Sequence, residues 1–147
     1  PISLLANGEV IFIGEGRLTT RPLVVFHEIF DKQGIKYNFG PEELPLTIDG
    51  RLRSGTFEVR GDISSQFITG LLYTLPKLEG QSEIVITTNL ESKGYIDLTL
   101  DILKRFGIKI INENYKKIIV PGNQCYEAYD YRVEGDFSQI AFWLVAG

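Results

Sequence analysis

A duplicated pattern of short motifs constrains the fold of this chain more than any other feature. Gly34-Ile35-Lys36 recurs as Gly107-Ile108-Lys109, which is 73 residues later. Val59-Arg60-Gly61-Asp62 recurs as Val133-Glu134-Gly135-Asp136, which is 74 residues later. Self-similarity at a nearly fixed period indicates one supersecondary unit that is used more than once. We therefore expect two related units that bury each other's apolar faces.

Each copy contains the same order of elements, and this order predicts an α/β fold with helices packed on sheets. Helices are expected over residues 21–33 and 95–106, each ending at a glycine, the residue favoured where the backbone turns left-handed. In the second helix Ile96, Leu100 and Leu103 recur at the spacing of one buried face. Strands are expected over residues 9–14, 35–39, 44–48 and 56–60 of the first copy, and over residues 83–88, 108–112, 117–120 and 131–134 of the second. A further apolar helix follows each Gly-Asp pair, over residues 67–75 and 140–145.

The repeat also suggests how the chain is divided. Residues 1–62 would be the end of one unit, residues 63–136 a second unit, and residues 137–147 the start of a third. The chain begins at Pro1, contains no methionine, and stops directly after the apolar run 140–145. We therefore expect a piece of a longer protein, a single truncated lobe rather than a complete one.

Length, charge and cysteine content exclude several classes of function. A chain of 147 residues can bury a core of ordinary size. Its formal charge of −4 argues against a surface for nucleic acid, although local amides and one or two basic side chains could still bind a small anion. The single cysteine, Cys125, permits no internal disulfide and no cysteine-based zinc site. No apolar run is long enough to span a membrane and no signal region is recognisable, so we expect a cytoplasmic protein.

The segment Gly61-Asp62-Ile63-Ser64-Ser65-Gln66-Phe67 lies where a predicted strand ends and a predicted helix begins. Asp62 is the expected N-cap, and the next backbone N–H groups have no partner within the helix. Such a helix start attracts anions, and two hydroxyls with one side-chain amide add neutral donors. Spacing alone leaves phosphate binding and plain helix capping as open alternatives.

Arg21, directly before Pro22, is a second candidate, because a guanidinium can hold a carboxylate or phosphate through two parallel hydrogen bonds. The alternative is a solvated surface arginine. In the second copy the corresponding polar loop is Glu91-Ser92-Lys93-Gly94-Tyr95, which suggests a shared binding face. His27 has no second histidine with which to form a metal site or triad, so we expect it to pack structurally.

Four ordered blocks make the chain similar to the 5-enolpyruvylshikimate-3-phosphate synthases over essentially its whole length. The blocks are Gly16-Arg17-Leu18-Thr19-Thr20-Arg21-Pro22, Gly61-Asp62-Ile63-Ser64-Ser65-Gln66-Phe67, Ser92-Lys93-Gly94-Tyr95-Ile96-Asp97 and Val133-Glu134-Gly135-Asp136. The resemblance implies an inside-out α/β barrel of two lobes, each built from three βαβαββ units, with the active site between the lobes. This chain would form part of one lobe.

The same resemblance implies roles for individual residues. Ser64, Ser65 and Gln66, together with Ser92 and Tyr95, would bind shikimate 3-phosphate. Arg21 and Gln66 would bind phosphoenolpyruvate. The family adds the 5-hydroxyl of shikimate 3-phosphate to C2 of phosphoenolpyruvate, passes through a tetrahedral intermediate, and expels inorganic phosphate. No metal or organic cofactor is implied, and the partners would be the two substrates and the second lobe of the same protein, with neither nucleic acid nor membrane.

The chain also departs from the family pattern. Gly94 stands where a proline is usual, which leaves the loop around Ser92 and Tyr95 more flexible. The family's N-terminal Lys-Ser…Arg block, its Asn-Ala-Gly-Thr loop and the acid and base residues of the second lobe are missing, so no catalytic residue is assigned here and the isolated chain is expected to be inactive. A UDP-N-acetylglucosamine enolpyruvyl transferase fragment and a non-catalytic anion-binding module remain the alternatives.

Overall fold

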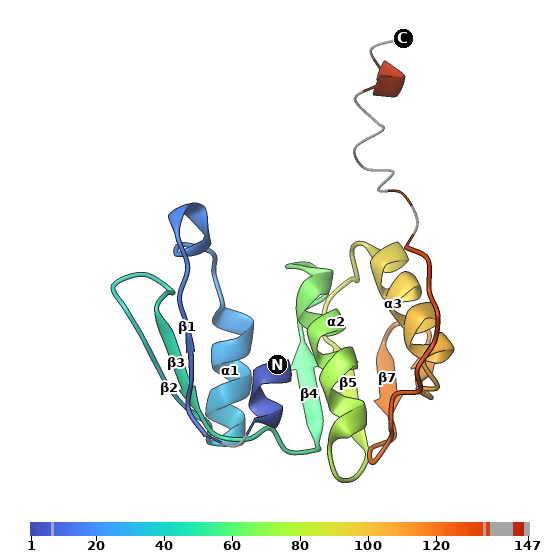
Figure 1. The fold of residues 1–147 in the computed structure, drawn as a ribbon, viewed down its shortest axis with the longest axis horizontal. Coiled ribbons are helices and arrows are strands. Elements are labelled where there is room, and N and C mark those ends of the chain that lie inside the picture. Colours follow the sequence, from blue (N-terminus) through green and yellow to red (C-terminus); the bar gives the residue numbers. More distant parts are fainter. Residues whose placement is uncertain (7, 134, 136–142, 146–147) are drawn as a thin grey trace.

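The computed structural model describes residues 1–6, 8–133, 135 and 143–145. Within these residues the strands form two sheets, and helices pack on them (Figure 1). The expectation of a mixed α/β fold is therefore confirmed. The start of a third unit, expected over residues 137–147, lies outside the described residues except for residues 143–145, and residues 140–142 of the predicted last helix also lie outside them.

The first sheet has three antiparallel strands in the order β1-β3-β2. They are β1 (Val10–Phe12), β2 (Lys36–Phe39) and β3 (Leu46–Asp49). Helix α1 (Val24–Gln33) connects β1 to β2, and the short 3-10 helices η1 (Ile2–Leu5) and η2 (Gly16–Leu18) flank β1 in the chain. Alternation along β3 buries Leu46 and Ile48, while α1 buries Val25, Ile29 and Phe30. The period of two in the strand and of three to four in the helix brings these apolar side chains into one core.

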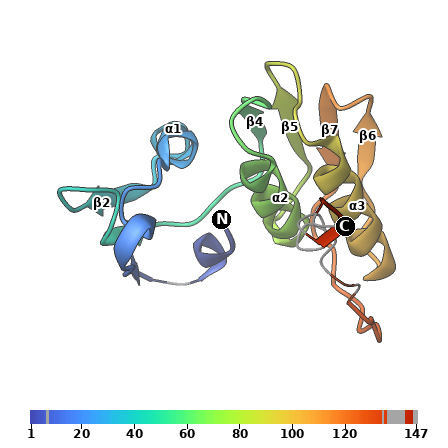
Figure 2. The same cartoon turned by 90° about the horizontal axis from the view of Figure 1, so that it is seen from above.

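The second sheet has four strands in the order β4-β5-β7-β6. They are β4 (Thr56–Val59), β5 (Ser82–Ile86), β6 (Ile111–Glu113) and β7 (Lys117–Val120). Strands β4 and β5 run parallel, and the other pairs are antiparallel. Helix α2 (Ser65–Thr74), extended by η3 (Leu75–Lys77), connects β4 to β5, and α3 (Lys93–Arg105) follows β5. Figure 2 shows α2 and α3 side by side on one face of this sheet.

The elements from β4 to β7 therefore follow one another as βαβαββ. The strands β1, β3 and β2 have the same spatial order as β5, β7 and β6, and a helix follows β1 as α3 follows β5. This equivalence is what the repeat in the sequence predicts. The exact unit boundaries at residues 62 and 136 stay a prediction.

The core of the second unit is built from apolar side chains of α2, α3 and the sheet. Ile68, Leu72 and Ile96 are completely buried, as are Ile84 and Ile118 of the strands beneath them. These residues recur with helical spacing on α2 and α3 and on alternate positions of the strands. The result is a closely packed layer that carries the loops at the ends of the strands.

Both predicted helix stops are confirmed. Gly34 follows α1 with φ of +66°, and Gly107 follows α3 with φ of +79°, so both occupy the left-handed region in which glycine is favoured. Helix α1, however, starts at Val24 and not at residue 21. Pro22 accounts for Arg21, because a residue before proline is disfavoured in the helical region. Leu23 is the N-cap, with a non-helical backbone (φ −112°, ψ 15°), so the helix begins at Val24.

Two strand predictions need correction. The first strand after α3 was expected over residues 108–112, but β6 covers Ile111–Glu113. Residues 131–133 form no strand, and residue 134 lies outside the described residues. This part of the chain lies along α3: the backbone N–H of Glu127 donates to the carbonyl of Phe106, and Arg105 stacks on the ring of Tyr131. This part of the chain therefore packs against α3 and does not pair with a strand at the sheet edge. Among the described residues, no helix has the length and apolarity that crossing a membrane requires.

Candidate functional site

Helices α1, α2 and α3 all begin at the same end of the molecule, the upper end in Figure 1. Each helix start presents backbone N–H groups without helical partners and the positive end of a helix dipole. All the predicted site residues belong to this end of the fold. Arg21 precedes α1, Ser64, Ser65 and Gln66 form the start of α2, and Ser92 and Tyr95 lie at the start of α3.

At the start of α2 the N-cap is Ser64, so the prediction that Asp62 caps this helix is wrong. Ser64 has an extended backbone (φ −165°, ψ 132°), and its Oγ accepts a hydrogen bond from the backbone N–H of Gln66 at 3.2 Å. The Ser64 hydroxyl keeps its own proton for donation. Ser65 is half-buried and Gln66 is exposed. Three neutral donors therefore surround one helix start.

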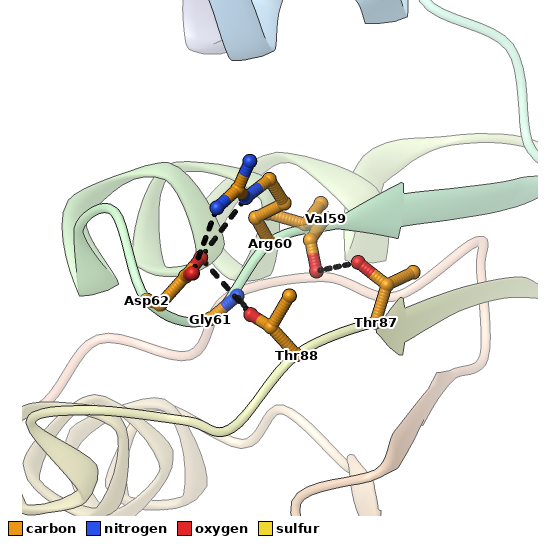
Figure 3. Close-up of polar contacts among 6 residues, drawn as sticks. All are labelled: Val59, Arg60, Gly61, Asp62, Thr87 and Thr88. Carbon is orange, nitrogen blue, oxygen red and sulfur yellow. Dashed lines mark hydrogen bonds and ion pairs between the residues drawn. The ribbon is translucent and has the colours of Figure 1, made fainter.

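Asp62 is unable to cap α2 because its carboxylate already has two other partners (Figure 3). Arg60 donates from Nε to Oδ1 at 3.0 Å and from Nη2 to Oδ2 at 2.8 Å, and Thr88 donates from Oγ1 to Oδ1 at 3.0 Å. The guanidinium of Arg60, assisted by the Thr88 hydroxyl, lowers the pKa of Asp62 to about 2. The carboxylate is thus ionised at neutral pH, and the paired arginine compensates its charge.

The start of α3 is built differently. Ser92 is the N-cap, but its backbone is left-handed (φ 57°, ψ 41°) and its side chain makes no cap hydrogen bond. Its hydroxyl is therefore left for other partners. Tyr95 is 63% exposed, which is a large exposed fraction for an aromatic side chain. Lys93, between these two residues in the chain, lies over the ring of Tyr115 at 5.2 Å from the centroid.

Arg21 and Gln66 line one cavity of about 370 Å³, although they come from different units of the fold. The rest of the cavity wall consists mainly of apolar side chains. These include Phe12, Ile13, Leu18, Leu23, Phe26, Phe30, Leu44, Leu46 and Ile48. Ser64, Ser65, Ser92 and Tyr95 lie at the same end of the fold but do not line this cavity. The six predicted residues therefore share one end of the fold, and only two of them share a cavity.

The loop that carries Arg21 is held by local hydrogen bonds. Thr19 donates from Oγ1 to the carbonyl of Gly16 at 2.9 Å, and the carbonyl of Thr19 accepts from the backbone N–H of Glu43 at 2.9 Å. Glu43 in turn lies against His27, with 3.3 Å between Oε2 and Nε2. This contact is within ion-pair distance but lacks hydrogen-bond geometry. Among the described residues, neither of these buried atoms has another hydrogen-bond partner.

His27 has the packing role that its isolation in the sequence predicted. Its ring stacks on Tyr37 and Phe39 with centroid distances of 5.0 and 5.1 Å. Across residues 1–6, 8–133, 135 and 143–145, no three His, Cys, Asp or Glu side chains gather as metal ligands would.

Comparison with known proteins adds a decisive observation. The family model described as EPSP synthase (3-phosphoshikimate 1-carboxyvinyltransferase) matches residues 2–147. This chain belongs to the EPSP synthase family. The fold agrees: the EPSP synthase of Acinetobacter baumannii superposes with a TM-score of 0.73 over 95% of this chain and 31% of that one, at 21% sequence identity.

Members of the family from clostridia are much closer in sequence. The 3-phosphoshikimate 1-carboxyvinyltransferase of Clostridium novyi (strain NT) is 60% identical over all 147 residues, which are 34% of that protein. The protein of the same name from Clostridioides difficile (strain 630) is 58% identical over 99% of this chain and 33% of its own length. The chain thus spans about a third of the length of the curated EPSP synthases it matches.

Two features of this EPSP synthase family member were not predicted from the sequence. One is the pair Thr88 and Arg60, which bind Asp62, and the other is the apolar wall of the cavity. Parallel pairing of β4 and β5 could have identified Thr88, because the carboxyl ends of neighbouring parallel strands meet at one edge of a sheet. The polar run Thr87-Thr88-Asn89 follows β5 at that edge, just as Gly61-Asp62 follows β4. The cavity wall has no comparable pattern, since its residues are scattered along the chain.

Proposed function

We propose that the full-length protein containing this chain is a 3-phosphoshikimate 1-carboxyvinyltransferase. It transfers the enolpyruvyl group of phosphoenolpyruvate to the 5-hydroxyl of shikimate 3-phosphate and releases inorganic phosphate. The observation that carries this proposal is the 60% identity, over the whole of this chain, to a relative with that name. We also propose that the protein is cytoplasmic, as the sequence predicts.

In this proposal the start of α2 binds the phosphate of shikimate 3-phosphate. Ser64 and Ser65 donate from their hydroxyls, Gln66 donates from its amide, and the helix dipole favours the negative charge. The free hydroxyl of Ser92 and the exposed side chain of Tyr95 bind the same substrate from the start of α3. These donors are neutral, so they bind the phosphate without adding charge to the site.

Phosphoenolpyruvate binds between Arg21 and Gln66 in this proposal. A guanidinium presents a planar pair of donors that matches a carboxylate or a phosphate, and an amide adds a third donor. Support comes from the cavity that these two side chains share across the boundary between the units. Gln66 would therefore contact both substrates, one on each side of its amide.

We further propose that this chain alone does not catalyse the reaction and binds shikimate 3-phosphate weakly. It covers about a third of its relatives, and the remaining part would contribute the second lobe and the acid and base residues. Half of a cleft lacks contacts to the substrate and does not exclude water, and both are needed for catalysis.

An amide NMR titration of this chain with shikimate 3-phosphate tests the binding site. Shifts should concentrate at residues 64–66 and at Ser92. Inorganic phosphate and UDP-N-acetylglucosamine are the comparison ligands. Equal shifts with inorganic phosphate would favour a general anion-binding module, and stronger shifts with UDP-N-acetylglucosamine would favour the alternative transferase. Shifts scattered over distant residues would contradict the site.

The activity itself is tested with the full-length protein. Release of inorganic phosphate should require both phosphoenolpyruvate and shikimate 3-phosphate. Replacement of shikimate 3-phosphate by UDP-N-acetylglucosamine should abolish the release. Phosphate release with UDP-N-acetylglucosamine, or turnover by the 147-residue chain alone, would overturn the corresponding part of the proposal.

A further inference from the structure

We infer that Thr88, together with Asp62, is a positioning residue, which holds the turn before α2 against the loop before α3. The two segments are residues 60–64 and 87–92, and we call the contact between them the Thr88 bridge. The first segment leads into Ser64, Ser65 and Gln66, and the second leads into Ser92. This inference rests on the proposed function, because it concerns how the proposed shikimate 3-phosphate site is kept in shape.

The hydroxyl of Thr88 makes two hydrogen bonds to the other segment (Figure 3). It accepts from the backbone N–H of Gly61 at 3.0 Å and donates to Oδ1 of Asp62 at 3.0 Å. A hydroxyl can accept and donate at the same time, whereas an apolar side chain of the same shape can do neither. Serine is therefore the replacement that preserves the bridge, and valine is the one that removes it.

Backbone contacts around Thr88 bring the same two segments together. The carbonyl of Gly61 accepts from the N–H of Glu91 at 3.1 Å, and the carbonyl of Val59 accepts from the N–H of Thr87 at 3.1 Å. A Cβ atom on Gly61 would lie 2.9 Å from Cα of Leu90 and 3.2 Å from the carbonyl oxygen of Asn89, so the main chain of this glycine rests directly on the second segment. The two segments pack so closely that a displacement of one would displace the other.

Arg60 fixes the direction in which the Asp62 carboxylate points. Its two hydrogen bonds hold both carboxylate oxygens, which leaves Oδ1 aimed at the Thr88 hydroxyl. The side chains of Arg60 and Asp62 are 59% and 33% exposed, and exposed ion pairs contribute little to folding stability. Orientation of the carboxylate and compensation of its charge near the start of α2 are the roles that this geometry supports.

The bridge lies close in the chain to the residues it would position. Asp62 is two residues before Ser64, and Thr88 is four residues before Ser92. Ser92 has a left-handed backbone without a side-chain cap, so it depends on its neighbours for its position. Because hydrogen bonds to a substrate weaken steeply with misplacement, a small shift between the two helix starts should weaken binding of a ligand that spans them.

The test uses the full-length enzyme with three variants, Thr88→Val, Thr88→Ser and the matched control Thr56→Val. Thr56 is exposed at the opposite end of β4, where valine fits a strand well.

Thr88→Val should raise the KM for shikimate 3-phosphate about fivefold to tenfold, as the loss of a hydrogen bond would. The KM for phosphoenolpyruvate should change by less, because of its two proposed ligands only Gln66 follows the bridge, and Arg21 lies in the other unit. Thr88→Ser and Thr56→Val should both remain within about twofold of the wild type.

Three results would overturn the inference. Thr88→Val could leave both KM values unchanged, Thr88→Ser could fail to rescue, or both KM values could rise equally, as they would if the change disturbed the whole substrate site and not the contact between the two helix starts. An inactive wild-type enzyme would instead refute the proposed function. In that case amide NMR spectra of the 147-residue chain without substrate still decide the inference. Thr88→Val must shift the amides of Gly61, Ser64 and Gln66 together with Ser92, and shifts confined to residues 86–90 would contradict the bridge.

Discussion

Arg21 and Gln66 line the same cavity, although Arg21 precedes α1 on the first sheet and Gln66 lies in the first turn of α2 on the second. The two units of the fold therefore meet at a place that carries a cation and an amide. This relationship leads to the first of four predictions.

Under the proposed function, replacing Arg21 with alanine in the full-length protein should raise the KM for phosphoenolpyruvate by about one to two orders of magnitude, because charged hydrogen bonds are stronger than neutral ones. Lysine should restore only part of the loss, since it lacks the planar pair of donors. Steady-state kinetics with each substrate varied in turn provide the measurement. Arg17→Ala is the matched control, because Arg17 is also exposed and lies in η2 of the same loop. Equal effects of the two alanine variants would argue against a specific role for Arg21.

Ser64→Ala should destabilise the chain by about 1 kcal/mol, because it removes the hydrogen bond that caps α2. Urea unfolding followed by circular dichroism measures the difference. Ser65→Ala is the control: Ser65 is the first residue of the helix and not its cap, so the change should cost clearly less. The structure would be wrong about this helix start if Asp62→Ala destabilised α2 as an N-cap variant and Ser64→Ala did not.

Gly94→Ala should stabilise the chain by about 0.5–1 kcal/mol, because alanine has less conformational freedom to lose in a helix. Gly94 is the second residue of α3, and a Cβ atom added there meets no heavy atom within 4 Å. Gly122→Ala should do the reverse, because its Cβ would overlap the carbonyl oxygens of Gly80 and Leu78. Thermal unfolding of both variants checks the contrast, and a destabilised Gly94→Ala would show that the glycine is required at this position.

The carboxylate of Asp62 should titrate with a midpoint near pH 2, well below the ordinary value for aspartate. The pKa of this carboxyl group is lower in the folded chain than in the unfolded chain, so the unfolded chain binds the proton more tightly. The contribution of Asp62 to the free energy of unfolding therefore rises with pH. That contribution is complete above about pH 4 and is lost as the pH falls towards 2. Carboxyl carbon shifts recorded across this range, with Asp62→Asn to assign the resonance, provide the test. A midpoint near 4 would mean that Arg60 does not hold the carboxylate in solution.

Sequence reasoning predicted the elements that depend on local chemistry. Strand β7 has the predicted bounds, and Gly34 and Gly107 end their helices as expected, because left-handed helix stops are a property of the residue itself. The sequence-based prediction failed for Asp62. Its carboxylate is bound by Arg60, two residues earlier in the chain, and by Thr88 from the neighbouring strand end, so it does not cap α2. The competition between these partners is visible only when β4 and β5 are placed side by side.

The candidate site was predictable to a similar extent. The motifs around Ser64 and Ser92 indicated helix starts with hydroxyl groups, and the structure has both at one end of the fold. That Gln66 would share a cavity with Arg21, and that Ser64 and Ser92 would not line it, depends on how two separate sheets pack. Such long-range packing produces no periodic pattern in the sequence from which it could be predicted.

The common orientation of α1, α2 and α3 has a consequence for ionic strength. Under the proposed function, anions at this end are held largely by direct hydrogen bonds from backbone N–H groups, hydroxyls and the Arg21 guanidinium, within about one turn of the helix starts. Dissolved salt strongly screens exposed charges that lie more than a Debye length apart, and direct, partly buried contacts much less. A phosphorylated ligand should therefore be retained at salt concentrations that would release it from a cluster of exposed lysines, even though the chain as a whole carries a formal charge of −4.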